Sequence, residues 1–303
     1  MTQCDLVVTG ATGFVGRHLV ARAREEGADI QVVDWDLRDG ALTAARLGAL
    51  NPRGVAHLAA GPRGGSAWSG LEDDMRMVGS LLAALEATPG SPVVLVAGSA
   101  AQYGMGAPRL LSEADPTEPL SAYGAAKCVL ERAVTAPALA GGVRVVWARA
   151  FNHVGPGQGD DAPAASWAGQ IAAAELAGGG ELRTGRLDVV RDFLDVRDVA
   201  AAYLALLRSP AEGVVNVCSG VATPLRDVAD ALVAQARCPI ERNEDPGLMR
   251  SVDPPHVVGD PARLKELTGW SPQFDLEHSL RDLLEDRREA VRGGAAVESG
   301  VAK

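Results

Sequence analysis

Short apolar runs recur along the chain and are separated by longer segments with helical periodicity. In most of these runs consecutive positions are apolar, which is typical of strands buried on both faces of a parallel sheet. We expect strands at Leu6–Thr9, Ile30–Asp34, Val55–Leu58, Val93–Ala97, Val143–Ala148 and Val214–Cys218.

The segments between the runs keep their apolar residues on one helical face, as a helix that covers a sheet must. Regular alternation of strands and helices predicts βαβ units. The predicted fold class is therefore α/β, with a doubly wound parallel sheet and a smaller C-terminal α/β lobe. One segment with this helical pattern has apolar residues at Val196, Val199, Ala200, Tyr203, Leu204 and Leu207.

The pattern loosens after about residue 153, where glycine and proline signal loops at Gly155–Gly159 and Gly178–Gly180. The sequence predicts a tail at its end, disordered from about Gly293 because the residues there are small and polar. We expect a main domain from 1–152 and 191–235, a smaller lobe from 153–190 and 236–288, and a tail from 289–303.

Composition excludes several classes of function. The chain has 303 residues and a net charge of −10, with no Lys/Arg cluster that would follow a phosphate backbone, so nucleic acid is not an expected partner. No apolar stretch approaches the roughly 18 residues that a membrane span needs. The first residues run into a strand without a signal peptide, so we expect a cytoplasmic protein. Spacing of the four cysteines predicts buried thiols and no metal site: Cys4, Cys128, Cys218 and Cys238.

A strand, a tight turn and a helix start follow one another in Leu6–Gly16. Gly10 permits the turn, Gly13 lets the backbone approach a pyrophosphate, and Gly16 lets helix and strand pack closely. The phosphates would bind free N–H groups at the helix N-terminus, where the helix dipole favours anions. The GxxGxxG spacing therefore predicts a Rossmann-type dinucleotide site in the main domain.

An acidic residue ends the next predicted strand. Asp34 lies 24 residues beyond Gly10, where a carboxylate can accept a hydrogen bond from the adenosine ribose 2′-OH. This favours NAD(H) as the cofactor, with NADP(H) as the alternative. Asp36 and Leu37 follow at once and are candidates for contact with the adenine.

Tyr123 and Lys127 lie four residues apart, so on a helix they share one face. A free phenol has a pKa near 10, and a neighbouring ammonium stabilises the phenolate, which makes a tyrosine a usable acid or base. Ser99 follows a predicted strand, at the edge where open α/β sheets bind ligands. It is a candidate to bond a substrate oxygen, and a helix-cap or turn serine is the alternative interpretation.

The glycine-rich turn, the Ser99 segment and the Tyr123–Lys127 pair, together with several further segments in the same order, resemble the extended short-chain dehydrogenase/reductase family of sugar-nucleotide epimerases, dehydratases and reductases. The resemblance spans about residues 5–288, and residues 149–158 and 191–220 are most similar to GDP-mannose dehydratases and GDP-4-keto-6-deoxymannose reductases. The matching segments are Thr9–Gly16, His57–Ala60, Gly98-Ser99 with Tyr103-Gly104, Ser121–Lys127, Arg149–Gln158, Arg191–Val199 and Gly269–Pro272.

The resemblance implies an NAD(P)-dependent oxidoreductase that acts on a nucleotide sugar, and it implies three groups of site residues. Guanidinium groups suit the substrate diphosphate because they bind phosphate oxygens bidentately, although a surface ion pair is the alternative for each arginine. The catalytic set would be Ser99, Tyr123 and Lys127, and the substrate would meet Asn152, Arg191 and Arg250. The cofactor would meet Gly10, Thr12, Gly13, Phe14, Val15, Asp34, Asp36, Leu37, Leu58, Ala59 and Ala60, together with Tyr123 and Lys127.

The choice of reaction depends on the residues after Ser99. Dehydratases of this family resemble one another in carrying acidic residues there, whereas this chain has Ala100, Ala101 and Gln102. Alanine cannot transfer a proton, so 4,6-dehydration is disfavoured. The likeness to the reductases favours NAD(P)H-dependent reduction of a nucleotide-linked 4-keto-6-deoxyhexose in deoxysugar biosynthesis, with a GDP-sugar preferred. A nucleotide-sugar 4-epimerase needs the same groups and is the alternative.

Three further expectations follow from the resemblance. A catalytically inactive dinucleotide sensor is disfavoured because the tyrosine and the lysine are both kept. Arg76 departs from the family, which often has an asparagine there near the cofactor. The family also implies a homodimer, formed through helices at roughly Met75–Leu85 and Ala122–Val134.

Overall fold

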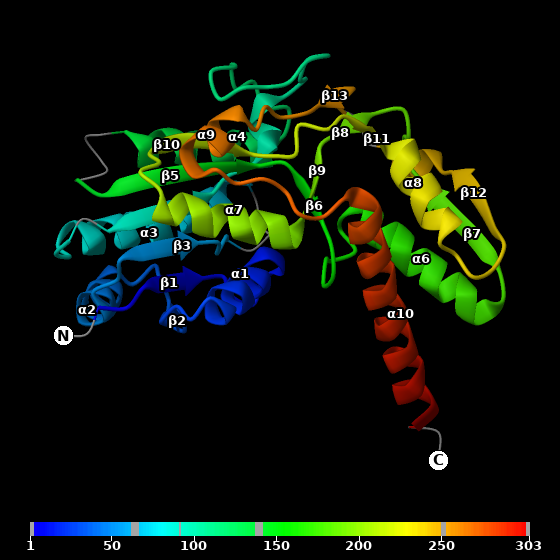
Figure 1. Ribbon diagram of the computed structural model, residues 1–303, viewed down its shortest axis with the longest axis horizontal. Coiled ribbons are helices and arrows are strands. Elements are labelled where there is room, and N and C mark those ends of the chain that lie inside the picture. The colour runs from blue at the N-terminus through cyan, green and yellow to red at the C-terminus, as the bar shows by residue number, and fades with distance from the viewer. Residues whose placement is uncertain (1–2, 62–66, 91, 137–141, 250–252, 301–303) are drawn as a thin grey trace.

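The computed structural model describes residues 3–61, 67–90, 92–136, 142–249 and 253–300. Its main feature is a six-stranded parallel sheet with strand order β10-β5-β4-β3-β1-β2 (Figure 1). The predicted α/β fold is confirmed, and each predicted strand is present with its ends within two residues of expectation. The strands are β1 (Leu6–Thr9), β2 (Ile30–Val32), β3 (Gly54–His57), β4 (Val93–Ala97), β5 (Arg144–Ala150) and β10 (Gly213–Val217).

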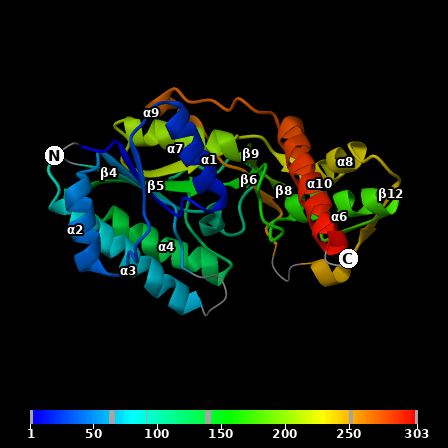
Figure 2. The same ribbon diagram turned by 90° about the horizontal axis from the view of Figure 1, so that it is seen from below.

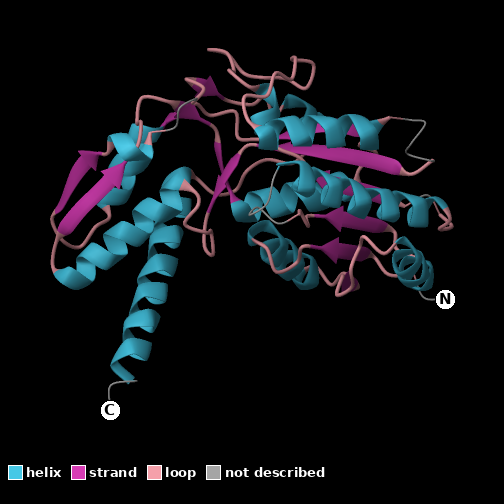
Figure 3. Cartoon of the chain, turned by 180° about the vertical axis from the view of Figure 1, so that it is seen from behind, coloured by secondary structure: helices cyan, strands magenta, loops and turns pink. Residues whose placement is uncertain are grey.

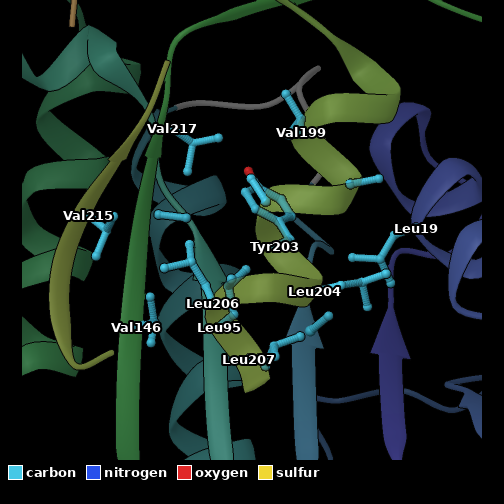
Figure 4. Packing of buried hydrophobic residues seen from close by; sticks show 14 of the residues in the cluster. Leu19, Leu95, Val146, Val199, Tyr203, Leu204, Leu206, Leu207, Val215 and Val217 are labelled. Atoms are coloured by element: carbon cyan, nitrogen blue, oxygen red, sulfur yellow. The ribbon is translucent and has the colours of Figure 1, made fainter. Parts of the chain in front are cut away.

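Helices cover both faces of this sheet, which is why its strands are apolar at consecutive positions. Leu6 and Val8 of β1 pack in one core with α1 (Phe14–Glu25) and α7 (Val196–Arg208). Figure 4 shows part of this core, with Leu19 of α1 and Leu204 of α7. Val7 points to the opposite face and packs in a second core. That core is completed by α2 (Gly40–Leu50), α3 (Ala67–Glu86) and α4 (Ala122–Thr135), and Figure 2 shows the two helix layers on opposite sides of the sheet.

A smaller lobe has its own apolar core, built from three helices and the parallel strand pair β7–β12. Here α8 packs with α6 and α10, so residues 225–234 join this lobe, although the boundary expected at residue 235 put them in the main domain. The elements of the lobe are α6 (Pro163–Ala177), β7 (Gly180–Thr184), α8 (Leu225–Ala234), β12 (Ile240–Glu244) and α10 (Leu276–Gly300).

Short strand pairs lie between the main sheet and the lobe. β6 (Asn152–Val154) pairs with β9 (Phe193–Asp195), and β8 (Val190–Arg191) pairs with β11 (Thr223–Pro224) and β13 (His256–Val257). α9 (Ala262–Thr268) returns to the main sheet, where it packs beside α7. The chain thus crosses between the two cores several times.

The end of the chain differs from expectation. The sequence predicts disorder from about Gly293, but α10 continues to Gly300 and extends away from the lobe (Figures 1 and 3). Each helical glycine costs about 1 kcal/mol relative to alanine, so the adjacent Gly293 and Gly294 weaken α10 but do not impose the break that a proline would. None of the helices in the described ranges combines the length and the apolarity that crossing a membrane requires.

All four cysteines are free thiols. Cys4 and Cys218 are buried, as expected, whereas Cys128 and Cys238 are only half-buried, so the prediction was wrong for those two. Burial, with help from Asp29, raises the pKa of the Cys4 thiol to about 11.

Candidate functional site

The glycine-rich turn after β1 has the geometry that a dinucleotide site needs. Gly10 has φ +66°, and a Cβ built on it would lie 2.6 Å from the Ala59 nitrogen, so only glycine fits between the two loops. A Cβ on Gly16 would lie 2.1 Å from the Gly10 oxygen. Gly13 is the N-cap of α1 and offers no side-chain cap, which leaves the first amides of the helix available to an anion.

A threonine that our sequence analysis did not single out supports this turn. The Thr9 hydroxyl oxygen accepts hydrogen bonds from the Leu58 nitrogen (3.2 Å) and the Ala59 nitrogen (3.1 Å), and lies 2.9 Å from His57 Nδ1. Burial, and secondly the charge of Lys127, lower the pKa of His57 to about 3, so its ring is neutral. The Thr9 hydroxyl therefore donates to Nδ1, and the predicted cofactor segment Leu58–Ala60 is fixed to the turn.

Of the residues expected around the adenosine, Asp34 is exposed, Asp36 is paired with an arginine, and Leu37 is buried. Asp34 is exposed just past the end of β2. Asp36 is held by Arg38, which donates to it from Nε (2.9 Å) and Nη2 (2.8 Å) and lowers the pKa of that carboxyl to about 2. Arg38 also bonds Asp73. The Leu37 side chain is buried in the second core, and its carbonyl oxygen accepts a hydrogen bond from Thr43 Oγ1 at 3.5 Å, so this residue packs the protein interior.

Ser99 lies at the carboxyl end of β4, where its side chain caps the short 3₁₀ helix η1 (Ala100–Tyr103). Its Oγ accepts from the Ala101 nitrogen at 3.2 Å, which is the alternative role that the sequence left open. This bond uses an acceptor lone pair, so the hydroxyl hydrogen remains available to a ligand.

A buried polar network that the sequence did not reveal holds η1 in place. Gln102 Oε1 accepts from the Ser99 nitrogen (3.4 Å) and from Trp147 Nε1 (3.0 Å). Gln102 Nε2 donates to Glu131 of α4 at 2.8 Å, and the Arg149 guanidinium binds both carboxylate oxygens of Glu131 at 2.6 and 2.7 Å. Since every group is paired, the network rigidifies the loop that carries Ser99.

Tyr123 and Lys127 lie in the first two turns of α4, as their spacing predicts. The Lys127 nitrogen is 5.9 Å from the centre of the Tyr123 ring. The helix begins against η1: a Cβ on Gly124 would lie 2.5 Å from the Ala101 oxygen, so the backbones touch there. The fold thus brings the turn of Tyr123 beside the loop of Ser99, with Tyr123 half exposed and Lys127 buried.

The acidic partner of Lys127 comes from α3. Lys127 Nζ lies 3.5 Å from Asp74 Oδ2 and 3.4 Å from the Ala97 oxygen. Arg76, the departure noted in the sequence, instead lies on the outer surface of α3 and pairs with Glu72 at 3.0 Å. The sequence gives no local signal for Asp74, because the contact joins positions far apart in the chain.

Of the three expected substrate residues, Arg250 lies outside the described residues. Asn152 in β6 and Arg191 in β8 are close neighbours, because Asn152 Nδ2 donates to the oxygen of Asp192 at 3.1 Å. Arg191 donates to the Pro254 oxygen (2.7 Å) and to Asp253 (2.5 Å), so part of its guanidinium is already engaged.

Asp192 itself is buried and structural. Its carboxylate accepts from the backbone nitrogens of Ser219 (2.8 Å), Gly220 (2.9 Å) and Gly259 (3.2 Å). Burial raises its pKa, and these hydrogen bonds oppose the rise. This aspartate holds the loop after β10 against the segment that carries Asn152 and Arg191.

A surface cavity of about 450 Å³ lies elsewhere, at the amino ends of the strands, with Asp5, Arg53 and Arg208 in its lining. Open α/β sheets bind ligands at the carboxyl ends of their strands. The turn at Gly10, the loop of Ser99 and the start of α4 all lie at that carboxyl edge, so we assign the candidate site there.

Comparison with known proteins gives consistent matches. The family described as the NAD dependent epimerase/dehydratase family matches residues 6–218. A GDP-6-deoxy-D-mannose reductase of Pseudomonas aeruginosa is 36% identical over 96% of this chain and 99% of that protein. A dTDP-6-deoxy-L-talose 4-dehydrogenase (NAD(P)(+)) of Kitasatospora kifunensis is 31% identical over 92% of this chain and 94% of that protein. The solved structure of RMD from Pseudomonas aeruginosa complexed with NADPH is 33% identical, has a TM-score of 0.80, and covers 95% of this chain and 98% of that one.

Proposed function

This chain belongs to the NAD-dependent epimerase/dehydratase family, and on that premise we propose that it reduces the C4 carbonyl of a nucleotide-linked 4-keto-6-deoxyhexose. The observation that carries the proposal is the arrangement at the carboxyl edge of β4. A half-exposed tyrosine lies over a buried lysine there, beside a serine loop whose next residues, Ala100 and Ala101, have no acid. The similar proteins named above as a reductase and a 4-dehydrogenase of 6-deoxy sugars support it.

In the proposed mechanism, a reduced nicotinamide cofactor held at the glycine-rich turn after β1 would supply the hydride for C4. Ser99 and Tyr123 hydrogen-bond the C4 oxygen, and Tyr123 gives its proton to that oxygen as negative charge develops, so the product is the alcohol. Lys127 keeps positive charge beside the phenol, which favours the tyrosinate left after proton transfer. The network around Gln102 keeps the Ser99 loop in place, so that little reorganisation is needed during reaction.

The same surroundings argue against dehydration. Elimination of water needs a base for the proton next to the keto carbon and an acid for the leaving hydroxyl, and neither alanine of η1 can serve. The third residue of η1, Gln102, is fully buried with its amide engaged by Trp147 and Glu131. Glu131 is itself bound by Arg149, so it is not available as a base.

We further propose that the nucleotide diphosphate meets Arg191 and Asn152, with Arg250 completing the group. Arg191 would exchange part of its pairing with Asp253 for phosphate oxygens, which bind a guanidinium bidentately. Binding energy from the nucleotide would then place C4 near the reactive groups. A GDP-sugar is the preferred substrate, because the reductase of 36% identity is named for one.

The cofactor assignment follows the acidic residue after β2. The exposed carboxylate of Asp34 suits a ribose 2′-OH and repels a 2′-phosphate, so we propose NADH as the preferred cofactor, with NADPH also accepted. The similar structure named above is a complex with NADPH, which makes the ratio of the two affinities worth measuring.

We also propose a homodimer that forms through α3 and α4, which pack side by side. Large apolar side chains are exposed on these two helices, namely Trp68 and Met75 of α3 and Val129 of α4. Exposed apolar residues on adjacent helices are candidates for contact with a partner, and here the partner would be a second copy of the chain.

The decisive experiment offers the purified protein a GDP-linked 4-keto-6-deoxy sugar with NADH, and separately GDP-mannose with NAD. We expect NADH to be consumed with the first substrate and no keto product from the second. The same assay with dTDP- and UDP-linked 4-keto-6-deoxy sugars then shows which nucleotide the protein prefers. Efficient dehydration of GDP-mannose would overturn the proposal, and interconversion of two 4-hydroxy sugars without net use of cofactor would identify a 4-epimerase instead.

A further inference from the structure

Asp74 connects three parts of the candidate site. It lies in α3 and is only 8% exposed. One carboxylate oxygen accepts a hydrogen bond from the Gly61 nitrogen at 2.7 Å, and the other lies 3.5 Å from Lys127 Nζ. Gly61 directly follows the predicted cofactor segment Leu58–Ala60, so a single buried carboxylate joins that segment to the lysine of α4.

The contacts of Lys127 explain why this carboxylate matters. Lys127 is 6% exposed, and within the described part of the chain its ammonium has two long polar contacts, to Asp74 and to the Ala97 oxygen at 3.4 Å. A buried ammonium needs a counter-charge, since removing its partner leaves an uncompensated charge in a poorly solvating interior. The ion pair with Asp74 supplies that charge, and its length leaves the ammonium able to reach a ligand as well.

Among the described residues, the other charged groups around the pair do not take this role. His57 of β3 is neutral, because burial and then Lys127 lower its pKa to about 3. Glu131 of α4 is bound by Arg149 of β5. Tyr203 of α7 is a buried neutral phenol whose pKa is raised by desolvation.

We propose that Asp74 is a positioning residue: it holds Lys127 beneath Tyr123 and balances the lysine charge, and so sets the pH range in which Tyr123 is a proton donor. This inference rests on the proposed roles of Tyr123 and Lys127, and it does not depend on which sugar is reduced. It predicts that the negative charge of Asp74 opposes ionisation of the phenol. Removing that charge leaves the lysine cation unbalanced, which favours the phenolate.

The structure offers a direct readout that needs no substrate. The chain has three tyrosines. Burial raises the pKa of Tyr103 to about 12 and raises that of Tyr203 further, whereas Tyr123 is half exposed. Ultraviolet absorbance reports phenolate formation, and we expect the first transition to be that of Tyr123, because the other two phenols are buried. The Tyr123→Phe variant verifies the assignment, because it should lack this first transition.

The experiment compares the wild type with Asp74→Asn, whose amide oxygen still accepts from the Gly61 nitrogen. We expect the first phenolate transition of this variant to move to lower pH by about one unit, which corresponds to loss of one partly screened charge. Asp74→Glu keeps the charge and should titrate near the wild type. Glu86→Gln makes the same charge change at an exposed position at the end of α3, and should leave the transition unchanged.

Each outcome is informative. A transition in Asp74→Asn that coincides with the wild type and Glu86→Gln overturns the proposal, even if the variant is less stable. If Asp74→Asn does not fold, Asp74→Ser is titrated against the same expectation. The proposed reductase function is judged separately, by NADH consumption. If the phenolate transition shifts in Asp74→Asn but the wild-type protein does not reduce the keto sugar, the role of Asp74 is supported and the proposed substrate is rejected.

Discussion

Replacing Gly124 with alanine should lower turnover strongly and lower folding stability only slightly. The added Cβ would lie 2.5 Å from the Ala101 oxygen, 3.0 Å from the Pro119 Cβ and 3.2 Å from the Ala101 carbonyl carbon. Ordinary contact begins near 3.4 Å, so the first turn of α4 must move away from η1 by about 0.9 Å. That movement carries Tyr123 away from the loop of Ser99.

Overpacking and the gain in helix propensity change the free energy of unfolding in opposite directions. Overpacking costs about 1–3 kcal/mol, whereas alanine in place of a helical glycine contributes about 1 kcal/mol. The net loss of unfolding free energy should therefore be between about 0 and 2 kcal/mol. Turnover should fall much further, by roughly 100-fold, since a misplacement of about 1 Å in a catalytic arrangement can cost that much.

The assay is NADH consumption with the GDP-linked 4-keto-6-deoxy sugar, with thermal unfolding measured on the same preparation. Gly48→Ala in α2 is the matched control, because a Cβ there has no atom within 4 Å, and we expect normal turnover with stability equal to or above the wild type. Wild-type turnover in Gly124→Ala together with higher stability would refute the reasoning, since it would mean that contact with η1 does not position Tyr123.

Four further predictions follow. Tyr123→Phe should keep its cofactor affinity in a binding titration and lose turnover by about 10²–10⁴-fold, and near-normal turnover would rule out its role as proton donor. NADH should bind more tightly than NADPH, and replacing Asp34 with asparagine should narrow the difference; equal affinities in the wild type would show that Asp34 does not select the cofactor. Gln102→Glu should lower the unfolding free energy in a denaturant titration by about 3–5 kcal/mol, because it buries a second carboxylate against Glu131, and an unchanged midpoint would contradict the described network. Light scattering at micromolar concentration should show a dimer, and a monomer would reject the proposed α3–α4 interface.

Much of the fold follows from local patterns in the sequence. β1, β3 and β4 are recognisable because they are short and apolar at consecutive positions, which is typical of a strand covered on both faces. The turn at Gly10 and the four-residue spacing of Tyr123 and Lys127 are also local features. Their geometry depends on backbone sterics and helical periodicity rather than on distant contacts.

Two errors in the sequence analysis have physical causes. The small residues after Gly293 suggested disorder, but α10 continues, since composition alone does not show where an isolated helix stops. α8 was placed with the main sheet, although its apolar face packs against α6 and α10. An amphipathic pattern indicates that a face is buried and does not indicate which core buries it.

The tertiary structure alone decided which distant residues surround the predicted site. Thr9 holds the loop after β3, Gln102 connects the Ser99 loop to Glu131, and Asp74 meets Lys127 across a separation of 53 residues. An aspartate or a glutamine on a helix has no local signature of such a role. Its partner depends on how two elements pack, and only the three-dimensional arrangement of α3, η1 and α4 brings these groups within hydrogen-bonding distance.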